Sequence, residues 1–145
     1  MHSILHRITI ETTPEKLYCA LTTQQGLSAW WTKTETHGDK LGSTNSFFFG
    51  PDGSHQVDMQ VESLKTNQQV VWQCVAGPWV ETGLFTFAIT PDERGAVLHF
   101  NHQGWSETDD FYQHCNCKWG FFLAVSLKSY LENGVGQPHP RDPNI

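Results

Sequence analysis

Positive charge is scarce in this sequence of 145 residues. It has nine Lys and Arg against fifteen Asp and Glu, a formal net charge of −6 with neutral His, and no run of basic residues. Nucleic acids and anionic membrane surfaces are bound through clustered positive charge. The composition therefore argues against both kinds of partner, and we expect no nucleic-acid binding.

Long apolar segments are missing as well. No stretch approaches the ~18 consecutive apolar residues that a membrane-spanning helix needs. Residues 1–7 lack the charged and apolar regions of a secretory signal. We expect a cytoplasmic protein that does not insert into a membrane.

The sequence also lacks the usual metal and catalytic signatures. Its four cysteines match no paired C-x-x-C zinc pattern, and we interpret them as reduced structural thiols; they are Cys19, Cys74, Cys115 and Cys117. His99 and His102 are three apart on an expected strand, so they face opposite sides and do not form a metal pair. With no glycine-rich phosphate loop and no G-x-S-x-G motif, we expect neither a metal nor a cofactor.

Aromatic residues, in contrast, are abundant. Six Trp and nine Phe contribute to an aromatic share of 12%. Such a set suits a cavity lined with rings, and it equally suits a core that is packed with rings and encloses no cavity. The composition leaves both alternatives open.

The N-terminal residues predict a strand followed by a helix. Residues 4–10 alternate in polarity, as a half-buried strand does. Two starts are compatible with the helix that follows. Thr13 can cap a helix whose first residue is Pro14, or Thr12 can cap it while Glu15 completes a capping box.

Two adjacent tryptophans follow this helix. We expect Gly26 to end the first helix and a second short helix to carry Leu27, Trp30 and Trp31. Two large rings cannot easily stay exposed on a small domain, so a large concave surface must receive them.

The middle of the chain predicts an antiparallel meander of short strands with tight turns. The expected inward positions are Phe47, Phe49, Val57, Met59, Val61, Val70, Trp72, Cys74, Phe85, Phe87, Ile89, Leu98, Phe100 and His102. None of the expected inward positions is Asp, Glu, Lys or Arg. From about Thr108 the spacing becomes helical, and Asn133-Gly134 is a good end for this long helix. We therefore expect one domain, residues 1–135, and a proline-rich tail, residues 136–145.

The order of these elements resembles the START-like (SRPBCC, helix-grip) superfamily, and within it the group named after the activator of Hsp90 ATPase, AHSA1. The segments that carry the resemblance span the chain and include residues 8–10, 13–18, 20–22, 27–31, 87–91, 98–105, 119–120 and 127–132. The resemblance implies an α+β fold. A curved antiparallel sheet of six to seven strands would wrap a long C-terminal helix, with two short helices after the first strand.

The resemblance also implies a ligand cavity between sheet and helix, for which we expect ~300–1,000 Å³. Its expected lining is Trp30, Trp31, Phe47, Phe49, Met59, Trp72, Phe85, Phe87, Phe100, His102, Cys115, Trp119, Phe122 and Ser126. His102 and Ser126 would orient a ligand oxygen. His102 is also the best candidate for an acid–base group, although a lone inward histidine more often belongs to the core.

Three functions remain open at this point. The leading one is non-enzymatic binding of a small apolar ligand such as a lipid, an isoprenoid or a polycyclic aromatic. The second is an enzyme of the polyketide cyclase or dehydratase type that uses His102. The third, ranked lowest, is a co-chaperone that stimulates Hsp90, because we see no room for the extra N-terminal module of the activators. A homodimer through Phe48 and Trp79 is also left open.

Overall fold

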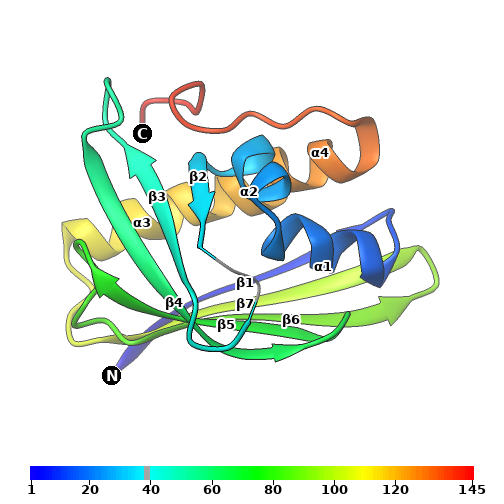
Figure 1. Ribbon diagram of the computed structural model, residues 1–145, viewed down its shortest axis with the longest axis horizontal. Coiled ribbons are helices and arrows are strands. Elements are labelled where there is room, and N and C mark those ends of the chain that lie inside the picture. Colours follow the sequence, from blue (N-terminus) through cyan, green and yellow to red (C-terminus); the bar gives the residue numbers. More distant parts are fainter. Residues whose placement is uncertain (38–39) are drawn as a thin grey trace.

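One curved antiparallel sheet wraps a C-terminal helix in this computed structural model, which describes residues 1–37 and 40–145 (Figure 1). The elements in chain order are β1 (His2–Ile10), α1 (Pro14–Thr22), α2 (Gln24–Trp30), β2 (Lys33–Thr36), β3 (Thr44–Phe49), β4 (His55–Lys65), β5 (Gln69–Ala76), β6 (Leu84–Asp92), β7 (Gly95–Trp105), α3 (Asp110–Phe121), the π-helical η1 (Phe122–Leu127) and α4 (Lys128–Asn133). The expected α+β helix-grip architecture is confirmed.

The seven strands lie in the order β1-β7-β6-β5-β4-β3-β2, and every neighbouring pair is antiparallel. Strands β3 to β7 form the expected meander, β2 extends it at one edge, and β1 adds to β7. Predicted inward residues meet directly across β6 and β7, where Phe87 opposes Phe100 and Ile89 opposes Leu98. Such pairs share one face of the sheet, so their side chains pack together in the core.

Strand β2 was not predicted from the sequence. It has four residues, Lys33-Thr34-Glu35-Thr36, and only Thr34 is buried. A short polar strand at the edge of a sheet carries too little apolar alternation to be recognised.

The two short helices meet at Thr23. Of the two possible starts for α1, the structure shows the one at Thr13, whose hydroxyl accepts the Lys16 amide at 3.1 Å. Thr23 ends α1 and caps α2, so the prediction that Gly26 breaks the helix was wrong. Gly26 lies inside α2, and a Cβ there would approach the Ala20 Cα to 2.6 Å. Glycine is needed because the two helices pack closely at this point.

The long C-terminal helix begins at the predicted residues. Asp109 caps it by accepting the Tyr112 amide at 3.0 Å, and Gly134 ends it with a left-handed φ of 85°. Its middle is π-helical over Phe122–Leu127, which the sequence did not indicate. No helix within residues 1–37 and 40–145 is long and apolar enough to cross a membrane.

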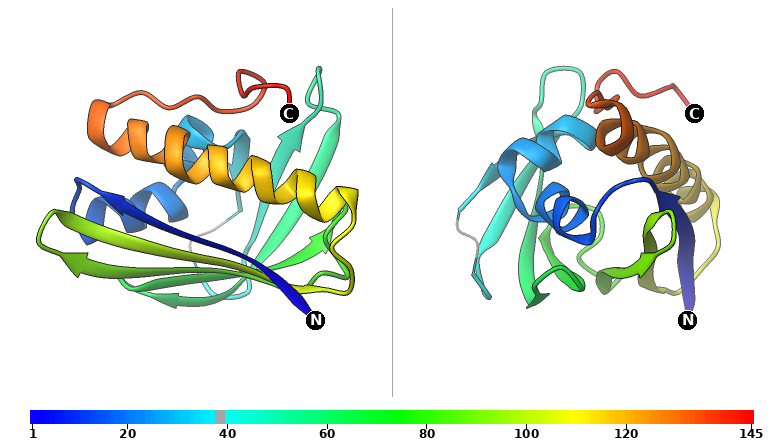
Figure 2. Two further views of the ribbon diagram at one scale, coloured as in Figure 1. Left: turned by 180° about the vertical axis from the view of Figure 1, so that it is seen from behind. Right: turned by 90° about the vertical axis from the view of Figure 1, so that its right-hand side faces the viewer.

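The C-terminal tail, residues 136–145, runs back above this helix toward the loop between β3 and β4 (Figure 2). Two amides hold it there. Gln137 N–H donates to Ser126 Oγ at 2.8 Å, and His139 N–H donates to the Trp31 carbonyl at 2.8 Å. The tail therefore becomes part of the surface around Trp31 and the helix.

Candidate ligand cavity

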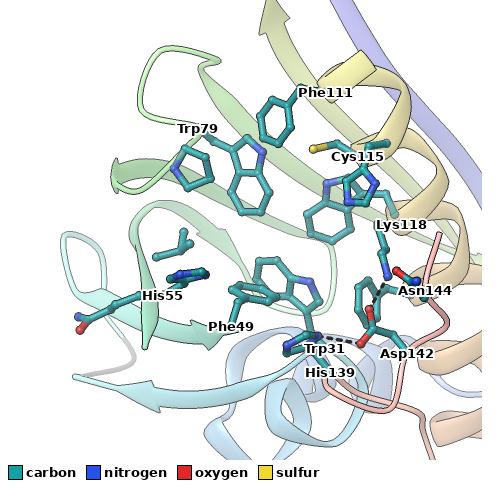
Figure 3. Close-up of a pocket in the computed structure, with 16 residues that line it drawn as sticks. Trp31, Phe49, His55, Trp79, Phe111, Cys115, Lys118, His139, Asp142 and Asn144 are labelled. Carbon is teal, nitrogen blue, oxygen red and sulfur yellow. Dashed lines mark hydrogen bonds and ion pairs between the residues drawn. The ribbon is translucent and has the colours of Figure 1, made fainter. Parts of the chain in front are cut away.

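A cavity of about 640 Å³ lies at the end of the sheet where the β3–β4 and β5–β6 loops meet α3 and the tail (Figure 3). Its volume falls within the range typical of small-molecule sites. The residues that line it are Trp31, Phe49, His55, Gln56, Val57, Pro78, Trp79, Phe111, His114, Cys115, Lys118, Trp119, Phe122, His139, Asp142 and Asn144. Segments far apart in sequence, from the end of α2 to the tail, thus contribute to one cavity.

The inner part of the cavity is an aromatic floor made by Trp31, Phe49, Trp119 and Phe122. The Trp31 ring centroid lies 4.9 Å from that of Trp119 and 5.4 Å from that of Phe49. Trp31 is held in place because it ends α2, next to Trp30, whose indole N–H donates to the Ala20 carbonyl at 2.8 Å. This floor offers ring faces and edges to an apolar molecule.

One side of the cavity is polar. Lys118 Nζ lies 2.6 Å from Asp142 Oδ2, and His139 Nδ1 lies 2.8 Å from Asp142 Oδ1. Burial alone would raise the pKa of the Asp142 carboxyl, but the hydrogen bonds from Lys118 and His139 outweigh it and keep that pKa below its usual value. Asp142 is therefore an ionised carboxylate at neutral pH.

The sequence of the chain identifies its family. The sequence model described as activator of Hsp90 ATPase homolog 1-like protein matches residues 11–132. The chain belongs to this family. No curated protein matches the chain.

Solved structures of similar proteins agree with the family assignment. The Aha1 dimer from Colwellia psychrerythraea is 41% identical, with a TM-score of 0.83 over 94% of this chain and 100% of that chain. Protein SSP2350 from Staphylococcus saprophyticus is 17% identical, with a TM-score of 0.76 over 93% of this chain and 95% of that one. CalU16 from Micromonospora echinospora is 12% identical, with a TM-score of 0.66 over 83% and 71%. The last two similarities, at 17% and 12% identity, show only that the fold is shared.

Five of the residues predicted to bind a ligand line the cavity of this family member: Trp31, Phe49, Cys115, Trp119 and Phe122. Cys115 is a free cysteine, and burial raises the pKa of its thiol to about 11. It therefore faces the cavity as a neutral thiol rather than as a reactive thiolate.

The other nine predicted residues do not line the cavity: Trp30, Phe47, Met59, Trp72, Phe85, Phe87, Phe100, His102 and Ser126. All nine are buried, and rings fill the space between the sheet and the helix. The Trp72 and Phe87 centroids, for example, are 4.7 Å apart, and Phe100 lies 4.5 Å from Trp119. The composition left open a cavity lined with rings and a core packed with rings. The interior contains both, because packed rings fill the core and a cavity remains at one end of the sheet.

The two polar residues expected to orient a ligand lie outside the lining and make hydrogen bonds within the protein. His102 Nε2 lies 2.9 Å from the Thr82 hydroxyl, and its ring stacks on Phe85 at 3.7 Å. Burial lowers the pKa of His102 to about 3. The Ser126 hydroxyl donates to the Trp30 carbonyl at 2.6 Å and accepts the Gln137 amide.

Sequence reasoning missed the polar side of the cavity. Lys118 precedes the inward Trp119 on α3 and was not assigned to the inward face. His139 and Asp142 lie in the tail, which the sequence marks only as unable to continue a helix. Trp79, expected on an outer surface, is half-buried and lines the cavity.

Proposed function

We propose that this protein binds a small apolar molecule, such as a lipid, an isoprenoid or a polycyclic aromatic, in the cavity above Trp31 and Trp119. The observation that supports the proposal is a cavity of about 640 Å³ with an aromatic floor. Ring faces gain from contact with apolar ligand surface that would otherwise face water. The proposal assigns no catalytic role to His102, because His102 lies outside the lining.

Dye binding with a matched pair of variants tests this proposal. Phe49→Asp places a charge at the cavity, whereas Phe48→Asp places the same charge on the next residue of β3, outside the lining. Both phenylalanines are half-buried. We expect the wild type and Phe48→Asp to bind the neutral dye Nile red, and Phe49→Asp to bind it at least ~10-fold more weakly.

The measurement is a Nile red fluorescence titration, with a thermal melt of each variant to confirm folding. Equal dye affinity in both folded variants, or no dye binding by the wild type, would contradict the proposal. Native mass spectrometry of the purified protein, followed by extraction, would then identify the class of any ligand that co-purifies.

We also propose that the chain forms a homodimer, because the 41% identical protein from Colwellia psychrerythraea is described as a dimer. Sedimentation velocity measures this directly. We expect a mass of about twice the 16.5 kDa of one chain, and a monomer at every concentration tested would exclude it. Stimulation of Hsp90 ATPase activity stays a prediction from the family resemblance.

A further inference from the structure

Charge is confined to one side of the cavity. Among the described residues that line it, Lys118 is the one amine and Asp142 the one carboxylate, and they form a direct pair. Figure 3 shows Lys118 and Asp142 pointing toward each other at the helix and tail side, away from Trp79. The cavity therefore has an aromatic floor and one end that carries a lysine–carboxylate pair. The lining also contains the polar side chains of His55, Gln56 and His114.

The Lys118 ammonium group at this end has more hydrogen-bond donors than acceptors among the described residues. Lys118 Nζ donates to Asp142 Oδ2 at 2.6 Å and to the Pro143 carbonyl at 2.5 Å, and both acceptors belong to the tail. An ammonium carries three protons. Within residues 1–37 and 40–145, these two are its hydrogen-bond acceptors, which leaves one donor for a ligand. The Lys118 side chain is 21% exposed, so a ligand can reach it.

The carboxylate is in the opposite situation. Asp142 already accepts from both Lys118 and His139, and its side chain is only 6% exposed. A cationic ligand would have to compete with two internal donors and would also meet the charge of Lys118. The Asp142 oxygens keep unused lone pairs, but the side chain is almost fully buried, whereas the Lys118 side chain is more exposed. The more accessible charged group at this end is therefore the ammonium, which favours an anionic group on the ligand.

We propose that the ligand is an amphipathic acid whose apolar body lies on the aromatic floor and whose carboxylate accepts a hydrogen bond from Lys118 Nζ. The proposal rests on the proposed function, since it names the ligand class of the same cavity. Asp142 would limit the affinity for such an acid, because it brings a second negative charge to the same ammonium group.

The test compares decanoic acid with decanol, which has the same chain length without a carboxylate, by isothermal titration calorimetry at neutral pH. We expect Lys118→Met to weaken decanoic acid binding about tenfold and to change decanol binding less than about twofold, because the variant removes one charged hydrogen bond. Lys65→Met, which removes a lysine outside the lining, should change neither affinity.

A second variant keeps the ammonium group in place. Asp142→Asn removes the competing carboxylate, and we expect it to strengthen decanoic acid binding about threefold or more without strengthening decanol binding. Loss of both affinities to the same extent in Lys118→Met, with no gain in Asp142→Asn, would overturn the inference. If Nile red binds the wild type but decanoic acid does not, the inference fails and the proposed function stands. If the wild type binds none of Nile red, decanoic acid and decanol, both the inference and the proposed function fail.

Discussion

Replacing Trp31 with alanine is expected to lower the free energy of unfolding by about 3–5 kcal/mol, the usual cost of removing a buried tryptophan. Trp31 is only 2% exposed, and its ring lies beside rings from both the sheet and the C-terminal helix. Its centroid lies 4.5 Å from Phe47, 4.9 Å from Trp119 and 5.9 Å from Trp72. Trp31 thus lies between rings of strands β3 and β5 and a ring of helix α3.

The cost arises because the cavity left by the indole cannot close. The rings around Trp31 are themselves held by the sheet and α3, so they cannot collapse into the space. Urea unfolding measures the effect as a lower midpoint at an unchanged slope. Trp79→Ala is the matched control, since Trp79 is half-buried at the outer side of the cavity. We expect it to cost less than half as much, and equal costs would contradict a central role for Trp31.

Acid should destabilise the protein through His102. In the unfolded chain, the imidazole has a pKa near 6.5, whereas burial lowers it to about 3 in the folded protein. Below pH 6.5 the unfolded state therefore binds a proton that the folded state does not, and stability falls as the pH drops toward 3. The loss from this one group should reach about 2 kcal/mol at pH 5.

The variant His102→Gln isolates this contribution. Glutamine keeps a polar group near the Thr82 hydroxyl but does not titrate, so we expect its unfolding free energy to fall less steeply between neutral pH and pH 5 (about 2 kcal/mol less). His99→Gln, at an exposed position on the other face of β7, should keep the steep dependence of the wild type. The comparison uses the change in unfolding free energy with pH. A substitution that lowers this free energy equally at every pH therefore does not affect the result. Identical slopes in the wild type and His102→Gln would show that His102 is not the group responsible.

The candidate cavity could be predicted only in part. Trp31, Cys115 and Trp119 follow from helical spacing and from the need to bury large rings, and the structure places them in the lining. Phe85 and Phe100 satisfy the same reasoning but fill the core instead. Alternation shows which face of a strand is inward, but it cannot show how completely the opposite helix fills the space above that face.

The polar side of the cavity could not be predicted from the sequence pattern at all. Lys118 and Asp142 are separated by 24 residues, and one of them belongs to a tail that has no periodic pattern. Their pairing depends on the path of the tail, which is set by its hydrogen bonds to Ser126 and Trp31. No local propensity encodes contacts of this kind.

The sequence by itself determined most of the architecture of this protein: the strand alternation, the Asp109 cap, the Gly134 helix end and the family. These features depend on short-range patterns that repeat the period of a strand or a helix. Only the tertiary structure decided where the cavity remains, that Gly26 is a packing position and that the tail closes one side around Lys118. Each of these depends on how closely segments distant in the chain approach one another, and that distance is a property of the packed molecule.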